Sequence, residues 1–358
     1  MAKWDKDYLD LCKRILNDGT EVENRTGINT IKVPSYHFQF DLEEEFPILT
    51  TKQLFIRQAV LEMLWIYQAA SNDVRWLQDR NVHIWDEWEV DEDGIYRIYE
   101  ADSEKTPYDK NREVPVLDPL SVPKYKHNGG LQLKKDENGN IMMAKSLSEE
   151  NSIRIYPDKE TIKKNIKNAK FYGKEYAHTI GTAYGYIVGK YHLIENLIDN
   201  LKNNRTDRRN VISLWQDEYV NTAVLPSCVW SSEWDVTDGK LNAWVHQRSC
   251  DVPLGLPFNV TQYAVLLNML ARVTGLKPGT LDWSIKDAHI YLNQIDGIKE
   301  QIRRGDELED LNAPELWLNP EVTDFYEYDN SKECKDVKLL NYKHHGKIRF
   351  PLAQWNYH

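Results

Sequence analysis

The sequence predicts an α+β fold, in which a mostly antiparallel or mixed sheet is backed by helices. Two patterns predict it. Four segments repeat apolar residues at the three- and four-residue spacing of helices, and three shorter segments lie between them and have the composition of strands. A hydrophobic share of 41% in 358 residues is enough for a substantial core. We expect one domain over residues 1–358.

The four predicted helices differ in how much of their surface is apolar. In residues 55–67, the apolar residues Ile56, Val60, Met63, Leu64 and Tyr67 recur at helical spacing, and residues 190–202 carry Leu193, Leu197 and Leu201 four positions apart. Residues 262–273 are apolar on nearly every face, so we expect this helix to be buried. Residues 291–303 place three isoleucines along one stripe. We expect these helices to form the layer behind the sheet.

The three predicted strands cover residues 211–215, 229–236 and 241–246. The last of them alternates apolar and polar residues, as a half-buried strand does. The Thr-Asp-Gly-Lys segment at 237–240 joins the last two strands, and Asp-Gly supplies the positive φ angles of a tight hairpin turn. Most of the sheet should therefore be antiparallel.

Residues 91–174 have a different composition from the rest of the chain. They are rich in Pro, Lys and Glu and contain Asn-Gly steps at Asn128 and Asn138. These features predict a surface insertion with its own hairpins. Long segments of this kind are more often decorative than functional lids.

Charge and cysteine usage exclude several classes of function. The net charge of −11 disfavours a protein that wraps a nucleic acid, although a local site for one small phosphate is compatible with it. The cysteines form no CxxC pair, no metal-binding spacing and no disulfide framework. Residues 1–16 lack an apolar leader, and no apolar run is long enough for a membrane span. We expect a cytoplasmic protein with reduced thiols.

One cysteine stands where a nucleophile is usefully presented. Cys228 follows Leu-Pro-Ser and opens a predicted strand, so its thiol can face a cleft. The reactive thiolate form would need cationic side chains nearby. By itself the signal is weak, since a lone cysteine is more often a small buried hydrophobe.

Several arginines suggest a site for a small dianion. Arg248 and Ser249 together offer a fork of donors and a hydroxyl group at a strand end. Arg208 and Arg209 stand just before a predicted strand, and Arg25 lies in a predicted turn. Each arginine alone is more often a solvated surface charge. In a strongly acidic chain, the set favours phosphate binding.

The order of many short motifs makes the chain similar to the thymidylate synthase family. The match covers residues 7–353 apart from the segment 91–174, and it is carried by Asn-Arg-Thr-Gly at 24, Phe-Pro-Ile-Leu-Thr-Thr-Lys at 46, Glu-Met-Leu-Trp at 62, Ile-Trp-Asp-Glu-Trp at 84, Asp-Arg-Arg at 207, Pro-Ser-Cys at 226, Gln-Arg-Ser-Cys-Asp at 247, Leu-Gly-Leu-Pro-Phe-Asn at 254 and Asp-Ala-His-Ile-Tyr at 287. Further segments at 71–74 and 314–317 resemble a subgroup from Gram-positive bacteria and their phages.

This resemblance implies a reaction, its substrates and a homodimer built through the sheet. The family methylates dUMP with 5,10-methylenetetrahydrofolate, which supplies both carbon and hydride, so no metal or nicotinamide is expected. Cys228 would add to C6 of the uracil ring. Arg208 and Arg209 would be donated to the partner's site across the interface. No membrane and no specific nucleic acid are expected as partners.

The resemblance also assigns roles to individual residues. Glu62 and Tyr184 would handle protons, and Glu62 should have a raised pKa because apolar residues flank it. Asn259 would read the base, since its amide fits uracil and misfits cytosine. The implied catalytic set is Cys228, Glu62, Tyr184, Asn259 and Asp251. The implied dUMP-binding set is Arg25, Arg208, Arg209, Gln247, Arg248, Ser249, Asp251, Asn259, His289 and Tyr291. The implied folate-binding set is Lys52, Trp85, Trp88, Leu225, Asp251, Gly255, Phe258 and Ala353.

The C-terminus departs from the family pattern and leaves an alternative open. Family chains end soon after the segment that matches residues 350–353, whereas this chain continues to His358. A displaced terminal carboxylate would let water intercept the methylene intermediate, giving 5-hydroxymethyl-dUMP and tetrahydrofolate. A dUMP hydroxymethylase is therefore the nearest rival, although Trp85 favours methylation. An idle nucleotide- or mRNA-binding dimer and a Cys–His hydrolase are the other classes considered.

Overall fold

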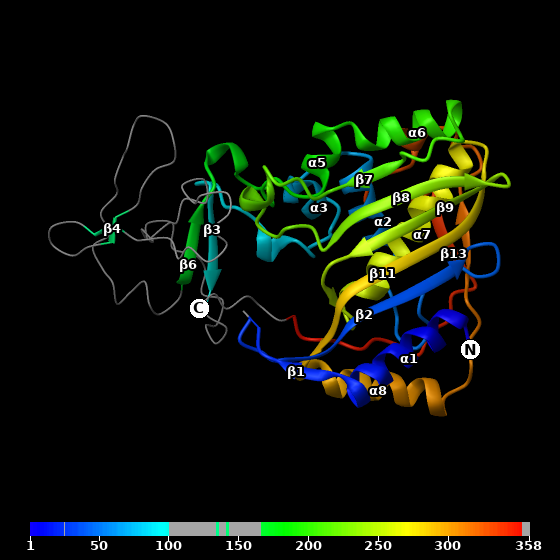
Figure 1. The fold of residues 1–358 in the computed structure, drawn as a ribbon, viewed down its shortest axis with the longest axis horizontal. Coiled ribbons are helices and arrows are strands. Elements are labelled where there is room, and N and C mark those ends of the chain that lie inside the picture. Colours follow the sequence, from blue (N-terminus) through cyan, green and yellow to red (C-terminus); the bar gives the residue numbers. More distant parts are fainter. Residues whose placement is uncertain (25, 100–133, 136–140, 143–165, 353–358) are drawn as a thin grey trace.

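A mixed sheet forms the centre of the molecule (Figure 1). The computed structural model describes residues 1–24, 26–99, 134–135, 141–142 and 166–352. Within them, the main sheet has seven strands in the order β1-β2-β11-β9-β8-β7, and β10 pairs with β11 outside this path. The strands of this sheet are β1 Thr20–Val22, β2 Thr30–Asp41, β7 Val211–Ser213, β8 Val229–Thr237, β9 Lys240–Gln247, β10 Cys250–Asp251 and β11 Lys277–Tyr291. The predicted α+β class with a mixed sheet is confirmed.

Strand β11 organises the sheet because it pairs with three other strands. It runs antiparallel to β2 and parallel to both β9 and β10. The pairs β8–β9 and β7–β8 are antiparallel. The parallel pairing of β10 with β11 sets Asp251 opposite His289. Residues far apart in the chain thus meet at one end of the sheet.

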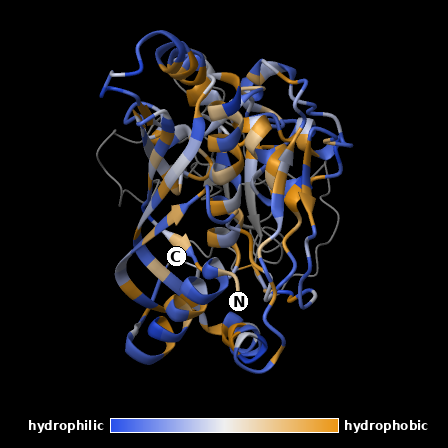
Figure 2. Ribbon diagram, turned by 90° about the vertical axis from the view of Figure 1, so that its right-hand side faces the viewer, coloured by the Kyte–Doolittle hydropathy of each residue, from blue (hydrophilic) through white to orange (hydrophobic). Residues whose placement is uncertain are grey.

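The helices pack against one face of the sheet. They are α1 Lys3–Asp18, α2 Ile56–Tyr67, α3 Val74–Gln78, α5 Gly185–Lys190, α6 Leu193–Asn203, α7 Gly255–Val273 and α8 Ile295–Glu307. Helix α7 contacts β9 and β11, α2 packs on α7, and α1 lies along β2 with α8 beside it (Figure 1). Figure 2 shows hydrophobic residues concentrated between these layers and hydrophilic residues on the outer loops.

The predicted helices are present, but three of them have shifted bounds. Helix α2 matches the prediction for residues 55–67. Helix α6 begins only at Leu193 because α5 ends at Lys190 and His192 has a left-handed φ of 51°. Helix α7 begins seven residues before the predicted start at residue 262, since Pro257 is tolerated in a first helical turn. Residue 291, predicted to begin a helix, instead ends β11.

The predicted hairpin is confirmed together with its turn. Strands β8 and β9 pair antiparallel as far as Thr237 and Lys240. Asp238 and Gly239 between them have φ angles of 51° and 72°, the positive values that the Asp-Gly step supplies. The elements outside the predicted segments include α1, β2 and most of β11. Local signals were present all the same, because buried residues of α1 recur at helical spacing and those of β11 alternate with less buried ones.

The segment 91–174 begins and ends in an antiparallel ribbon. Strand β3 Ile95–Tyr99 pairs with β6 Ile166–Phe171, and the short strands β4 Lys134–Lys135 and β5 Ile141–Met142 pair with each other. The other residues between 100 and 165 lie outside the described part of the chain. That the whole segment is a surface insertion stays a prediction.

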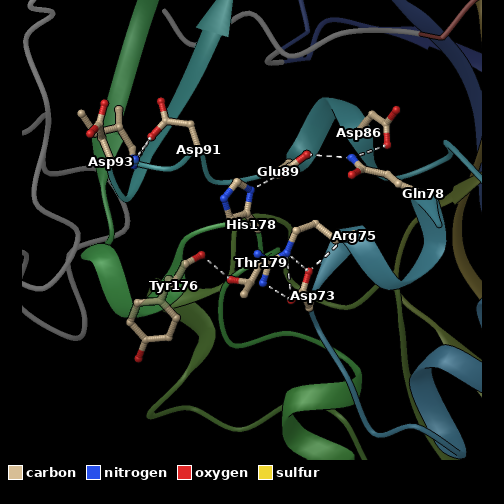
Figure 3. A network of polar contacts seen from close by, with 11 residues as sticks. Asp73, Arg75, Gln78, Asp86, Glu89, Asp91, Asp93, Tyr176, His178 and Thr179 are labelled. Atoms are coloured by element: carbon tan, nitrogen blue, oxygen red, sulfur yellow. Dashed lines mark hydrogen bonds and ion pairs between the residues drawn. The ribbon is translucent and has the colours of Figure 1, made fainter. Parts of the chain in front are cut away.

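A polar network lies beside this ribbon (Figure 3). The Nδ1 atom of His178 lies 2.8 Å from Oε1 of Glu89, and Gln78 donates to the other carboxylate oxygen over 2.9 Å. Nearby, the guanidinium of Arg75 pairs with Asp73, which also caps α3. Through Glu89, these contacts join the segments that flank the ribbon to helix α3.

Two further strands, β12 Glu315–Leu318 and β13 Val337–Leu340, form a small antiparallel sheet. Within the described ranges, no helix combines the length and the apolar character that crossing a bilayer requires.

Candidate active site

The half-buried thiol of Cys228 lies at the entry to β8. Its backbone N–H donates to the hydroxyl oxygen of Tyr184 over 2.9 Å. Tyr184 itself has a φ of 47°, which is uncommon outside glycine, and its side chain is buried. Burial raises the pKa of this phenol well above its ordinary value, so the hydroxyl keeps its proton at neutral pH.

Arg248 holds the segment that carries this thiol. Its Nε donates to the carbonyl of Ser227 over 3.0 Å, and its Nη2 donates to the carbonyl of Pro226 over 2.7 Å. The same Nη2 lies 3.9 Å from Sγ of Cys228. A guanidinium at this distance favours the thiolate over the thiol. A cation therefore lies beside the proposed nucleophile, as its reactive thiolate form needs.

Glu62 is a buried carboxyl group in helix α2. It is 7% exposed, and it accepts hydrogen bonds from Nε1 of Trp85 over 2.6 Å and from Nε2 of Gln262. Burial raises the pKa of Glu62 to about 7, and the two donors oppose part of that rise. This is the direction expected from its apolar neighbours in the sequence. A carboxyl group with this pKa can both take up and release a proton near neutral pH.

The side chain of Asn259 sits between two glutamines. Its Nδ2 donates to Oε1 of Gln262 over 3.2 Å, and its Oδ1 accepts from Nε2 of Gln247 over 3.4 Å. Gln247 is itself oriented by the indole N–H of Trp283, which donates to Oε1 over 3.0 Å. Each amide atom of Asn259 keeps one further hydrogen-bonding position for a ligand.

The end of β11 presents two aromatic side chains to the same side. The rings of His289 and Tyr291 lie 5.2 Å apart, as expected for alternate residues of an extended segment. Nδ1 of His289 lies 2.9 Å from Oδ1 of Asp287. This contact, with Lys32 on the other oxygen, lowers the pKa of Asp287 to about 2. The charged Asp287 fixes the imidazole so that Nδ1 carries a proton.

Asp251 lies beside His289 through the pairing of β10 with β11. Its carboxylate accepts from the backbone N–H of Leu254 over 3.2 Å and from Nε2 of Gln294 over 3.3 Å. Gln294 also donates to the carbonyl of Pro351 over 3.1 Å, so it joins the end of the described chain to Asp251. Burial raises the pKa of Asp251.

An aromatic wall stands next to the thiol segment. The ring of Trp85 makes edge contacts with Trp88 and Tyr184, at centroid distances of 5.4 and 5.5 Å. Leu225 and Phe258 are partly buried against the core. A Cβ atom added at Gly255 would meet only Oδ1 of Asn259 within 4 Å, at 3.5 Å.

Three other expected site residues are placed differently. Lys52 is 6% exposed, its ammonium donates to the carbonyl of Pro253, and burial lowers its pKa to about 8. Arg208 and Arg209 are exposed, and Arg209 pairs with Asp207 over 2.9 Å. Arg208 lines a hollow of about 460 Å³ on the sheet, together with Trp244 and Asp282. Arg25 and Ala353 lie outside the described residues.

The remaining substrate residue, Ser249, is partly exposed between β9 and β10, and its carbonyl accepts from Nε2 of Gln247 over 3.2 Å. In the described ranges, no group of three or more His, Cys, Asp or Glu side chains is arranged to hold a metal ion.

Sequence reasoning missed the residues that orient the others. Gln262, Trp283, Asp287 and Gln294 all contact expected site residues, yet none was singled out for its side chain. Gln262 carried a signal, because it is a polar residue in an otherwise apolar helix, three positions after Asn259. Buried amides in such a helix need partners.

A family model described as thymidylate synthase matches residues 6–354. The chain belongs to the thymidylate synthase family. It is 39% identical to the thymidylate synthase of Clostridium beijerinckii, over 99% of this chain and 100% of that protein. Identity to thymidylate synthase 1 of Bacillus subtilis strain 168 and to the thymidylate synthase of Bacillus phage phi3T is 32%, at the same coverage.

The fold agrees with this assignment. A solved structure of the thermostable thymidylate synthase A from Bacillus subtilis superposes with a TM-score of 0.68, at 32% identity, covering 98% of this chain and 99% of that one. The resemblance read from the motifs is confirmed, including its link to Gram-positive bacteria and their phages.

Proposed function

We propose that this protein is a thymidylate synthase, which methylates dUMP to dTMP with 5,10-methylenetetrahydrofolate and releases dihydrofolate. The observation that carries the proposal is the thiol of Cys228 held 3.9 Å from the guanidinium of Arg248, within a chain that matches the family from residue 6 to residue 354. The protein is thus a methyltransferase.

The reaction begins at the sulfur of Cys228. The thiolate forms a bond to C6 of the uracil ring, which turns C5 into a nucleophilic enolate carbon. C5 then bonds to the one-carbon unit of the folate and loses its proton. The bond from that unit to the folate nitrogen breaks, which leaves a methylene group on C5 and releases tetrahydrofolate. Hydride from this tetrahydrofolate then adds to the methylene, giving the methyl group and dihydrofolate, and the bond from C6 to sulfur breaks. Arg248 favours the charged sulfur at the start and the end of this sequence.

Nucleotide recognition is assigned to three groups of residues. Arg248 and Ser249, with Arg25, would bind the phosphate. Asn259 would pair with the base edge, where its two remaining hydrogen-bonding positions fit O4 and N3–H of uracil. His289 and Tyr291 would bind the sugar hydroxyl, and Gln247 supports Asn259 at the same site.

Proton transfers are assigned to Glu62 and Tyr184. A pKa of about 7 suits Glu62 to exchange protons with the ring through water. Tyr184 accepts a hydrogen bond from the backbone N–H of Cys228, which would set its phenol near the carbon that loses its proton. Its retained phenolic proton makes it a hydrogen-bond donor for the water or base that receives the C5 proton.

The folate is assigned to the aromatic wall and to Asp251. Trp85 and Trp88 offer flat faces to its rings, and the carboxylate of Asp251 suits the N–H edge of the pterin. Leu225, Gly255, Phe258 and Ala353 would complete the cleft. Contact of Lys52 with the glutamate tail requires its ammonium to leave Pro253 and turn outward.

A homodimer through the sheet is supported by the outer face of the strands. Trp244 and Trp230 are 47% and 36% exposed there, and both rings contact His246, at 5.3 and 5.8 Å. An aromatic surface of this kind marks an interface. In this dimer, Arg208 and Arg209 would serve the partner's phosphate site. Mixing inactive Arg208→Glu and Cys228→Ala proteins should restore activity, because one hybrid site is intact; unrestored mixtures would contradict shared sites.

The proposed nucleophile is tested by covalent trapping. Incubation with 5-fluoro-dUMP and methylenetetrahydrofolate should add the mass of both compounds to the peptide bearing residue 228, because fluorine takes the place of the C5 proton and cannot leave as the proton does. The Cys228→Ala protein is the matched control and should stay unmodified. An unmodified wild-type peptide would refute the assignment.

The rival reaction, hydroxymethylation of dUMP, differs in its folate product. The curated relatives of this chain carry the name thymidylate synthase, which favours methylation. Methylation raises the absorbance of dihydrofolate in step with dUMP consumption. Consumption of dUMP without dihydrofolate would establish the hydroxymethylase instead.

A further inference from the structure

The side-chain amide of Asn259 lies at the middle of a chain of hydrogen bonds whose two ends have fixed polarity. The chain runs from Trp283 through Gln247 to Asn259, and then through Gln262 to the backbone of Ala59. An amide has nearly the same shape when its oxygen and nitrogen are exchanged, so its orientation depends on its partners.

One end of the chain is an obligatory donor. The indole N–H of Trp283 can only donate, and this ring is fully buried. Gln247 must therefore turn its oxygen toward Trp283, as it does at 3.0 Å. Its Nε2 then faces Asn259 and the carbonyl of Ser249. Gln247 thus presents a hydrogen-bond donor, its Nε2, to Asn259.

The other end is an obligatory acceptor. The carbonyl of Ala59 in α2 accepts from Nε2 of Gln262 over 3.1 Å, and the second proton of that nitrogen goes to the carboxylate of Glu62. Gln262 is 4% exposed, so no water competes with these partners from outside. Its oxygen must then face Asn259 and present an acceptor.

We infer that Gln262 and Trp283 are positioning residues that fix the polarity of the Asn259 amide and thereby the choice of uracil over cytosine. The inference rests on the proposed function. With a donor on one side and an acceptor on the other, Asn259 has one stable orientation. Uracil offers N3–H and O4, whereas cytosine offers the reverse pattern at N3 and N4, so a flipped amide would accept the wrong base.

Gln262 has a second effect that Trp283 lacks. Its Nε2 joins Asn259 to the carboxylate of Glu62, so the group that reads the base and the group that handles protons share one amide. Loss of Gln262 removes a hydrogen bond that favours the charged form of Glu62. The two positioning residues can therefore be told apart by experiment.

The test compares Gln262→Met and Trp283→Phe with the wild-type protein. Both substitutions keep most of the side-chain volume and remove the group that sets polarity. Isothermal titration calorimetry with dUMP and dCMP should show the preference for dUMP reduced about tenfold in each variant, the effect of one lost hydrogen bond. In the pH dependence of kcat, only Gln262→Met should move the Glu62 transition to higher pH.

Gln68→Met is the matched control. Gln68 is also a buried glutamine next to α2, and it donates to two backbone carbonyls, those of Phe325 and Tyr328, away from Asn259. In thermal melts, the Gln68→Met protein should lose about as much stability as the Gln262→Met protein. It should nevertheless keep the wild-type preference for dUMP. If Gln262→Met does not fold, Trp283→Phe carries the test of polarity.

The outcomes separate this inference from the proposed function. A wild-type protein that turns over dUMP, with variants that keep its nucleotide preference, overturns the role of Gln262 and Trp283 and leaves the function standing. A wild-type protein that neither binds nor turns over dUMP overturns both.

Discussion

At the scale of single residues, Glu62 shows how the helix layer tunes one ionisable group. The carboxyl group is surrounded by apolar side chains of α2 and keeps only the donors of Trp85 and Gln262. Desolvation exceeds the effect of these two bonds, so the folded protein binds the proton more tightly than the unfolded chain does. The charged form therefore costs stability.

Replacing Glu62 by Gln should make the stability of the protein less dependent on pH. Because its pKa rises from 4.5 to about 7 on folding, wild-type Glu62 contributes stability that is complete below pH 4.5 and lost as the pH rises through 7. The free energy of unfolding that is lost over this pH range is about 3 kcal/mol. Urea unfolding at pH 5 and pH 8 should show Glu62→Gln gaining relative to the wild type at pH 8. An unchanged difference between the two pH values would contradict the raised pKa.

A substitution at Gly255 should affect the stability of the fold and the binding of folate differently. An added Cβ meets only Oδ1 of Asn259 at an ordinary contact distance, and alanine is the better residue for a helix. Gly255→Ala should therefore fold at least as stably as the wild type. If Gly255 lines the folate cleft, KM for methylenetetrahydrofolate should rise about tenfold from crowding, while dUMP affinity is unchanged. An unaltered folate KM would remove Gly255 from the cleft.

At the scale of elements, the hairpin of β8 and β9 depends on its two turn residues. Gly239 has a φ of 72°, and a Cβ added there would have nothing within 4 Å. The cost of Gly239→Ala is therefore purely one of backbone conformation, about 1 kcal/mol. We expect a lower midpoint of urea unfolding with full enzymatic activity at 25 °C. A loss well above this value would indicate a contact that the open turn does not have.

This hairpin also illustrates how far sequence reasoning reached. Local signals predicted the Asp-Gly turn, the strands it joins and the helix α2, because each depends on neighbouring residues. Strand β11 was missed although Leu281, Trp283 and Ile285 alternate with polar residues. Its pairing with three strands distant in sequence is what local signals could not supply. In the same way, the motifs pointed to Asn259, but the residues that orient it come together only in the fold. Trp283 acts on Asn259 through Gln247, a contact that requires the pairing of β11 with β9. Gln262 meets its acceptors in α2 only through the packing of α2 on α7.

At the scale of the whole molecule, helices cover one face of the sheet, and the other face exposes aromatic side chains. Trp244 stands on that open face between Glu233 on β8 and Asp282 on β11, with His37 of β2 also in ring contact at 6.2 Å. Four strands thus contribute to one surface. Its extent explains why a dimer is expected to form through the sheet.

A charge placed on this surface should separate the dimer. Trp244→Glu would bury an unpaired carboxylate at the proposed interface, so analytical ultracentrifugation should show a monomer for the variant and a dimer for the wild type. Activity should fall with dimer content, since Arg208 and Arg209 would no longer reach a partner. Leu308→Glu, at an exposed position beyond α8, is the control and should stay dimeric. A Trp244→Glu dimer would place the interface elsewhere.

The bond from the backbone of Cys228 to the phenol of Tyr184 has a consequence for how this tyrosine should be studied. The phenolic oxygen already accepts a hydrogen bond from the backbone N–H of Cys228. Tyr184→Phe would therefore leave that N–H without its acceptor as well as remove the phenolic proton. A lower rate in the Tyr184→Phe variant could then come either from a displaced Cys228 sulfur or from the missing phenolic proton. Incorporation of a fluorinated tyrosine separates the two, since the ring substituent changes acidity and leaves the oxygen in place.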